Sequence, residues 1–222
     1  MTANVKIVLN KIGKSKIFDD IYFTGGTALS YYLNHRISED IDLISSKKLN
    51  YKSIISQMTV LGAKKVKDEH EVALKMAGLF PDEYIIKFIL DGVKIEFFYA
   101  NRPIQQEILS QVDFKNFQNL KLKILDIKSI AKLKLVALVL RNKSRDLFDF
   151  GIILERNIFD KDELIEQFLK IDNKLNSFDK IVKFIKNKKE PYDDEAVYLS
   201  ETKRVDLSFD EIKDRVLEKL KT

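Results

Sequence analysis

The sequence predicts an α/β fold of the α+β kind, in which a mixed sheet with helices comes first and a mostly helical part follows. Three observations carry this prediction. Residues 21–45 have the pattern strand, glycine pair, helix, strand, and residues 84–99 hold two β-favouring runs around Asp91-Gly92. After residue 126, apolar residues recur at helical spacing in successive segments. We therefore expect an α/β core in residues 1–125 and a mostly helical part in residues 126–222.

The composition of the 222-residue chain is that of a soluble globular protein, with 45% hydrophobic and 33% charged residues. Cysteine is absent, which excludes disulfides and thiolate metal sites and is typical of the reducing cytoplasm. No apolar run approaches the about 20 residues of a membrane-spanning helix, and the amino-terminal segment lacks the apolar core of a signal peptide. We therefore expect a cytoplasmic protein that does not engage a membrane. The net charge of +5 permits a polyanionic partner without requiring one.

The first expected helix covers residues 5–18, because Val5, Val8, Leu9 and Ile12 share one face. The expected strand that follows is stopped by a pair of adjacent glycines, Gly25 and Gly26. Two glycines leave the backbone amides open to close approach by a phosphate. Thr27 is a good N-cap for the next helix, and a helix N-terminus directly after such a turn is a ready anion site.

The second strand of this unit is expected at residues 38–44, where alternation places Ser38, Asp40 and Asp42 on one face. Two carboxylates about 7 Å apart along a strand repel each other unless a cation lies between them. A glycine turn for phosphate beside a carboxylate pair for a divalent metal is what nucleotidyl transfer requires. Each feature also has a plainer interpretation, since a glycine pair often forms only a turn and alternating acids often line a solvated strand face.

The remaining elements of the first part follow from caps and turns. Asn50 is expected to cap a helix that Gly62 ends, and a strand is expected at residues 71–80. The Asp91-Gly92 turn fixes the register of the hairpin, so that Lys87 lies opposite Glu96. Residues 105–123 have a mixed pattern that is typical of a connecting segment.

Asp126 is expected to cap a helix over residues 127–143, in which Lys134 lies at the centre of the apolar stripe. A lysine in that position must either extend its amine to solvent or find an anion. Four further helical stretches are expected, and the last begins with a capping box of Ser208 and Glu211. A lysine-rich run within the second of them forms either a solvated helix face or a patch that faces nucleic acid. The four stretches are residues 160–171, 177–188, 193–202 and 208–220.

Two pairs of motifs resemble one known family. The sequences GGTAL at residues 25–29 and RISEDID at residues 36–42 resemble the first motif of the AbiEii/AbiGii toxin family. The spacing KLVAL at residues 134–138, followed by RDLFD at residues 145–149, resembles its second signature. The resemblance implies a nucleotidyltransferase-type fold and transfer of a nucleoside monophosphate from an NTP to a hydroxyl acceptor, with release of pyrophosphate.

The resemblance also implies roles for individual residues and partners. Mg²⁺, or Mn²⁺ in its place, would be the cofactor, and the acceptor would be RNA such as tRNA, as for the MenT-type relatives. A separately encoded antitoxin would be the protein partner. The residues implied as catalytic are Asp40, Asp42, Lys134, Asp146 and Asp149; those implied for nucleotide binding are Gly25, Gly26, Thr27, Arg36, Ser38 and Arg145; and the metal ligands are Asp40, Asp42 and Glu96.

Alternatives remain open at this stage. Glu96 is either a third metal ligand or only the cross-strand partner of Lys87. The chain is alternatively a small-molecule nucleotidyltransferase that modifies antibiotics, or a nucleotide-binding pseudoenzyme. For Lys134 we expect replacement by methionine to leave stability at least unchanged and to abolish catalysis.

Overall fold

A computed structural model describes residues 1–15, 17–67, 74, 76–200 and 202–221. These residues form two compact units. The first unit contains residues 1–34 and 38–126, and the second contains residues 35–37 and 127–222. A compact unit does not by itself show an independently folding domain, so the division of the sequence at residue 125 stays a prediction.

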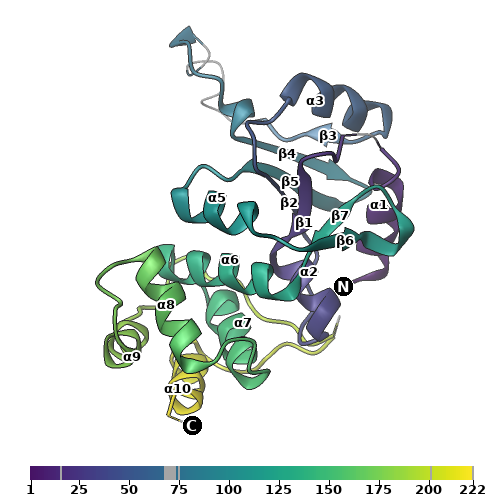
Figure 1. The fold of residues 1–222 in the computed structure, drawn as a ribbon. Helices are drawn as coiled ribbons and strands as arrows, with labels where there is room; N and C mark the ends of the chain where they lie inside the picture. The colour runs from purple at the N-terminus through teal and green to yellow at the C-terminus, as the bar shows by residue number, and fades with distance from the viewer. Residues whose placement is uncertain (16, 68–73, 75, 201, 222) are drawn as a thin grey trace. The chain divides into compact units, whose positions relative to one another are not determined.

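The first unit is built on a mixed sheet, which confirms the predicted fold class (Figure 1). In the described residues the sheet has seven strands in the order β3-β4-β5-β2-β1-β7-β6. β1 pairs with β7 and β2 pairs with β5 in parallel, whereas the other neighbours are antiparallel. The strands are β1 Ile21–Thr24, β2 Ile41–Ser45, β3 Lys64–Lys65, β4 Ile85–Leu90, β5 Val93–Tyr99, β6 Phe114–Asn116 and β7 Lys123–Leu125.

The hairpin of β4 and β5 has the predicted register. Asp91 and Gly92 have φ angles of 49° and 80°, as the tight turn of a two-residue hairpin requires. Lys87 therefore pairs with Glu96, and the opposite face places Phe88 beside Ile95 in the core. The helices of this unit are α1 Ala3–Ile12, α2 Gly25–Leu33, α3 Tyr51–Val60 and α5 Pro103–Ser110.

Three expectations for the first unit need correction. α1 ends at Ile12 instead of residue 18, because Gly13 follows as its C-cap. The segment expected as a connection, residues 105–123, contains most of α5 and all of β6, whose fully exposed strand pattern gives no alternation of apolar residues. The strand expected at residues 71–80 lies partly outside the described residues, and the described residues 74 and 76–80 contain no strand.

The second unit is helical, as predicted. Asp160 and Ser208 form capping boxes with the glutamates three residues later, and these boxes start α8 and α10. The helix expected at residues 193–202 is wrong: the described residues of this stretch are irregular, and Tyr198 forms an isolated bridge with Arg204. The helices are α6 Ile127–Leu140, α7 Ser144–Glu155, α8 Lys161–Ile171, α9 Phe178–Lys186 and α10 Phe209–Lys219.

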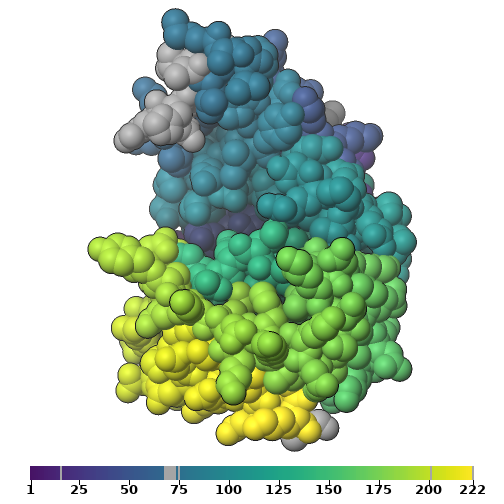
Figure 2. Space-filling view, turned by 90° about the vertical axis from the view of Figure 1, so that its left-hand side faces the viewer, coloured from purple at the N-terminus to yellow at the C-terminus, as the bar shows by residue number. Residues whose placement is uncertain are grey.

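α10 closes the second unit by packing on α7 and α9. Figure 2 shows the yellow surface of α10 adjoining the green surface of the preceding helices. Phe209, Ile212 and Val216 form the buried face of α10. Across the described part of the chain, the helices are too short or too polar to span a membrane.

Candidate active site

The glycine pair forms the first turn of α2 rather than a separate loop before it. Gly25 has a φ of +78°, a conformation that favours glycine. A Cβ at this position would lie 2.6 Å from Cγ and 2.7 Å from Cβ of Asp42, so only glycine fits beside that side chain. The carboxylate of Asp42 is thus held against the start of α2. The free N–H groups of a first helical turn are an anion site.

Thr27 is the third residue of α2, so the expectation that it is the N-cap is wrong; Thr24 holds that position. The Thr27 hydroxyl is hydrogen-bonded to the main-chain oxygen of Asp40 and lies 2.8 Å from Ser38 Oγ. Because a carbonyl only accepts, Thr27 donates to Asp40, and the same hydroxyl is shared with Ser38. The fully buried Thr27 therefore fixes the loop that precedes β2.

That loop also changes the placement of the first acid. β2 begins at Ile41, so Asp40 lies before the strand and not within it, against the expectation. The hydrogen bond from Thr27 to its main-chain oxygen holds Asp40 out of the sheet ladder. Asp42 is the second residue of β2 and is partly exposed, between the buried Ile41 and Leu43.

The sheet places Asp42 in a row of polar side chains across four strands. Asp42 pairs with Thr24 of β1 on one side and with Glu96 of β5 on the other, and Glu96 pairs with Lys87 of β4. Directly paired residues point to the same face of a sheet, so these four side chains share one face. We call Thr24, Asp42, Glu96 and Lys87 the polar row.

Glu96 lies beside both of its expected partners, the acid Asp42 of the proposed metal site and the cross-strand Lys87. It is the register partner of Asp42, and its carboxylate lies 3.4 Å from Lys87 Nζ and 3.9 Å from Lys94 Nζ. The two lysines are almost half exposed, so these pairs stabilise the fold only slightly.

The chemistry of this row fits a hard divalent cation. Carboxylate oxygens of Asp42 and Glu96 occur at neighbouring positions of one sheet face. Mg²⁺ is usually held by one or two carboxylates, with substrate phosphates and water completing its shell. Within the described ranges no three His, Cys, Asp or Glu side chains converge as a complete metal cage, and such a cage is not what Mg²⁺ requires.

For Glu96 we expect Glu96→Gln to raise the Mg²⁺ concentration needed for half-maximal activity at least about tenfold, because one anionic ligand is lost. The free energy of unfolding should change by less than about 1 kcal/mol, since the lysine pairs are exposed. Titration of activity with Mg²⁺ and urea unfolding measure the two effects, with Lys87→Gln as the matched control that removes the pair and keeps the carboxylate. Unchanged Mg²⁺ dependence in Glu96→Gln would limit Glu96 to its lysine pairs.

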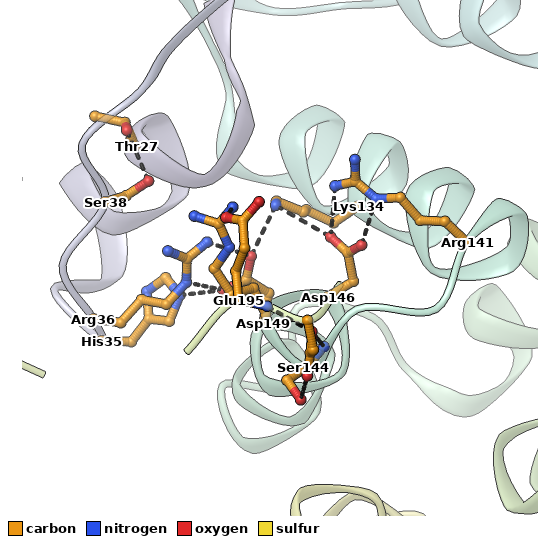
Figure 3. A network of polar contacts seen from close by, with 12 residues as sticks. Thr27, His35, Arg36, Ser38, Lys134, Arg141, Ser144, Asp146, Asp149 and Glu195 are labelled. Atoms are coloured by element: carbon orange, nitrogen blue, oxygen red, sulfur yellow. Dashed lines mark hydrogen bonds and ion pairs between the residues drawn. The ribbon is translucent and has the colours of Figure 1, made fainter. Parts of the chain in front are cut away.

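The second unit has a buried ion-pair network centred on Asp149 of α7 (Figure 3). Arg36 donates to both oxygens of Asp149, with Nε at 2.7 Å from Oδ1 and the second nitrogen at 3.0 Å from Oδ2. His35 Nε2 lies 2.8 Å from Oδ1, and Lys134 Nζ lies 2.8 Å from Oδ2. Asp149 is fully buried, and the side chains of His35 and Arg36 are each 2% exposed.

Asp146 extends this network along α7. Arg141 donates to both of its oxygens at 2.6 and 3.1 Å, and Lys134 Nζ lies 3.7 Å from Oδ1. Asp146 is almost completely buried, whereas Arg141 is more than half exposed. The network therefore pairs the two buried carboxylates, Asp146 and Asp149, with cations from the 35–37 peptide, from α6 and from the loop that follows α6.

The charge state of Asp149 follows from these contacts. Burial raises the pKa of Asp149, but the charges of Arg36 and Lys134 and the hydrogen bonds with His35 and Arg36 outweigh it, and the pKa lies well below its usual range. A carboxyl whose pKa is lower in the folded than in the unfolded state stabilises the fold above its unfolded pKa of about 3.9. That contribution is lost as the pH falls through the folded pKa.

We therefore expect the free energy of unfolding to decrease as the pH falls below about 5, down towards the depressed pKa of Asp149. Asp149→Asn, which cannot titrate, should show a smaller decrease over the same range. Urea unfolding at a series of pH values measures both slopes. Equal acid slopes in the two proteins would mean that other carboxylates cause the acid sensitivity.

The amine of Lys134 has partners within the second unit: its side chain is 10% exposed and contacts Asp149 and Asp146. These contacts change the stability expected for Lys134→Met, because the substitution removes a buried ion pair as well as an amine in an apolar stripe. We now expect Lys134→Met to lower the free energy of unfolding by about 1.5–3 kcal/mol, the value of a hydrogen bond to a charged group. Arg36 still neutralises Asp149, which limits the loss. Urea unfolding at pH 7 measures it, and Lys132→Met, at a partly exposed lysine of the same helix, is the control. An unchanged midpoint in Lys134→Met would contradict the network's contribution.

Three successive acids bind the start of α7. Ser144 donates from its main-chain nitrogen to Asp194 at 3.0 Å and from its hydroxyl to the same carboxylate. Lys143 pairs with Asp193 at 3.1 Å, and Arg145 pairs with Glu195. Arg145, expected to bind nucleotide, is thus engaged by a carboxylate of the same unit. Asp194 thus caps α7 from 50 residues away, and the segment of residues 193–195 is irregular with its acids turned to the start of α7.

Sequence reasoning missed two buried residues of this unit. His35 was not assigned a role, although it stands beside Arg36 of the first motif and contacts the same carboxylate. Lys188, in the lysine-rich run, is buried and donates to the main-chain oxygen of Arg141 and to Asn142 Oδ1, each at 2.9 Å. Burial lowers the pKa of Lys188 to about 8, while Asp146 opposes that shift. No periodicity distinguishes Lys188 from its exposed neighbours.

Comparison with known proteins identifies the family. A family model described as nucleotidyl transferase AbiEii toxin of a type IV toxin–antitoxin system matches residues 7–219. The chain belongs to the AbiEii family. The recognition from motifs is confirmed, and this AbiEii protein is a nucleotidyltransferase. Its family implies an NTP as substrate and an antitoxin as partner.

Individual relatives extend the comparison. The AbiEii chain is 28% identical over 199 residues to the uncharacterized protein aq_aa25 of Aquifex aeolicus, with 87% of each chain covered. Its structure is similar to JHP933 from Helicobacter pylori, with a TM-score of 0.52, 19% identity and coverage of 98% of this chain and 89% of that one. It is also similar to the nucleotidyltransferase toxin MenT4 from Mycobacterium tuberculosis, with a TM-score of 0.55, 14% identity and coverage of 96% and 77%. At these identities the solved structures establish a shared fold.

Proposed function

We propose that this AbiEii protein transfers a nucleoside monophosphate from an NTP to a hydroxyl group of RNA, such as tRNA, in a Mg²⁺-dependent reaction in the cytoplasm. The acceptor oxygen would form a bond to the α-phosphorus, the bond from that phosphorus to the bridging oxygen would break, and pyrophosphate would leave. The observation that carries this proposal is the carboxylate of Asp42, held against the first turn of α2 and beside Glu96.

In this proposal the first turn of α2, at Gly25 and Gly26, receives the triphosphate through its N–H groups. Asp42 and Glu96, with Asp40, would hold Mg²⁺ or Mn²⁺. The metal, when bound, polarises the α-phosphate and lowers the pKa of the acceptor hydroxyl. Thr27 and Ser38 position the loop of Asp40 through their hydrogen bond.

The roles proposed for residues of the second unit rest on the family motifs and not on the geometry of a site. The buried network consists of ion pairs among Arg36, Lys134, Asp146 and Asp149. Arg145 forms an ion pair with Glu195. Their catalytic and nucleotide-binding roles stay predictions from the family motifs. The structure itself supports a positioning role for Arg36, which joins the peptide before Ser38 to α7.

An RNA acceptor is supported by charge. The chain has a net charge of +5 and a pI near 9.0, and lysines recur along residues 180–189. Binding of a polyanion by lysine and arginine releases condensed counterions, so affinity for tRNA should fall steeply as salt is raised.

The proposed function is tested by incubating the protein with each labelled NTP in turn, Mg²⁺ and total tRNA, and separating the products on a denaturing gel. Label in the tRNA band that requires Mg²⁺ and decreases with added salt is the expected result. Pyrophosphate release without labelled RNA, but with a labelled aminoglycoside when one is supplied, would favour the small-molecule class. Absence of pyrophosphate release under every condition would contradict nucleotidyl transfer by this site.

A further inference from the structure

Thr24 is a buried polar residue at the start of α2 to which no role is assigned above. It is the last residue of β1 and the N-cap of α2, and it is 2% exposed. A threonine N-cap normally accepts a hydrogen bond from the second or third N–H of its helix. Thr24 makes no such bond, and its Oγ1 has no hydrogen-bond partner among the residues that the structure describes.

An unpaired buried hydroxyl is costly, and most buried polar atoms in proteins have a partner. The apolar isostere valine, favoured at the end of a strand, would avoid this cost. The hydroxyl at Thr24 is therefore not explained by the packing of the first unit alone. Its surroundings indicate what it serves.

The direction of the side chain follows from the register of the sheet. Thr24 pairs directly with Asp42, so both side chains lie on the face that carries the polar row. The side chain of Asp42 lies against Gly25, the residue that follows Thr24. The Thr24 hydroxyl, the N–H groups of the first turn of α2 and the Asp42 carboxylate are consequently neighbours at one end of one helix.

We propose that Thr24 is a phosphate-binding residue, whose Oγ1 donates a hydrogen bond to a phosphoryl oxygen of the NTP held at the N-terminus of α2. This inference rests on the proposed nucleotidyl transfer. It adds to that proposal a side-chain donor for the phosphates, beside the main-chain N–H groups of the helix. The N–H groups of the first turn of α2 and the Thr24 hydroxyl are all donors, which matches the acceptor-only oxygens of a phosphate. Thr24 accordingly contributes through the phosphates and not through the base.

The test uses Thr24→Val, which removes the hydroxyl and keeps the shape, and Thr24→Ser, which keeps the hydroxyl. Ser30→Ala is a matched control, because Ser30 also has a buried Oγ without a partner among the described residues and belongs to the same helix. For each full-length protein, isothermal titration calorimetry measures the Kd for each NTP with Mg²⁺ and for inorganic tripolyphosphate. The midpoint of thermal unfolding without ligand measures stability.

We expect Thr24→Val to weaken binding of both NTP and tripolyphosphate about tenfold or more, as the loss of a hydrogen bond to a charged group predicts. Its unfolding midpoint should equal or exceed that of the wild type. Thr24→Ser should bind within about threefold of the wild type, and Ser30→Ala should leave both Kd values unchanged.

Two results would overturn the inference while leaving the proposed function intact. One is wild-type affinity for tripolyphosphate in Thr24→Val. The other is a lower unfolding midpoint with unchanged affinity, which would show that the hydroxyl serves the fold; if Thr24→Val does not fold, Thr24→Ala is measured instead and the same two criteria apply. Failure of the wild type to bind any NTP or tripolyphosphate would overturn the proposed function and the inference together.

Discussion

Replacement of Asp149 by alanine is expected to lower the free energy of unfolding by about 3–5 kcal/mol, the cost of leaving a buried charge without its partner. Arg36 and Lys134 both lose their counter-ion, and their side chains are only 2% and 10% exposed. His35 loses its contact as well. Since domains of this kind are stable by only about 5–15 kcal/mol, the variant should be near the limit of folding. Urea unfolding at pH 7, followed by circular dichroism, measures the change.

A matched control separates this effect from the loss of any carboxylate on a helix. Glu166 of α8 pairs with Lys170 one turn later at 3.0 Å, and both are exposed. Glu166→Ala should therefore cost less than about 0.5 kcal/mol. If Asp149→Ala were no more destabilising than Glu166→Ala, the network would not hold α7 to the 35–37 peptide.

The hairpin shows what local sequence can determine. Two residues, Asp91 and Gly92, adopt positive φ angles and fix the register of β4 and β5. The pairing of Lys87 with Glu96 follows from that turn without reference to the rest of the chain. Capping signals at Asn50 and Ser208 were equally reliable, because a cap is a contact between residues three apart.

The start of α2 shows where local rules fail. Thr27 has the chemistry of an N-cap, yet the helix begins two residues earlier, at Gly25. The reason is tertiary: the Thr27 hydroxyl is used by Ser38 and by the main chain of Asp40, and the Asp42 side chain occupies the space beside Gly25. The same contacts place Asp40 before β2. Neither the alternation of residues along a strand nor the capping preference of a residue type can predict these long-range contacts.

The buried network was predicted only in part. The apolar stripe of α6 predicted that Lys134 needs either an exit to solvent or an anion, and the structure supplies Asp146 and Asp149 as that anion. The sequence could not show that Arg36 and His35, 113 and 114 residues from Asp149, use the same carboxylate. Pairs so far apart leave no periodic signal, and Arg145 was expected to bind nucleotide. Arg145 instead contacts Glu195, in a segment whose sequence favoured a helix.

The second large effect is expected at Asp42. Asp42→Asn should reduce transfer about a thousandfold or more while the protein stays folded, because the substitution keeps the shape and removes the charge that the proposed metal site needs. The stability change should not exceed about 1 kcal/mol, since Asp42 is partly exposed and its main fold-level contribution is a carboxylate beside the N-terminus of α2. Initial rates of pyrophosphate release at saturating NTP and Mg²⁺, with urea unfolding of the same preparation, measure both quantities.

Asp20→Asn is the matched control for that experiment. Asp20 is a half-exposed acid of the first unit that pairs with Lys47 at 2.9 Å, outside the polar row. Its replacement removes the same charge from the same unit and should leave the rate unchanged. An Asp42→Asn protein that turns over at more than about a tenth of the wild-type rate, or an Asp20→Asn protein that loses as much activity, would exclude Asp42 as the acid on which transfer depends. A rate loss confined to Asp42→Asn, combined with a steeper Mg²⁺ requirement in Glu96→Gln, would locate the proposed cation between these two neighbouring strands.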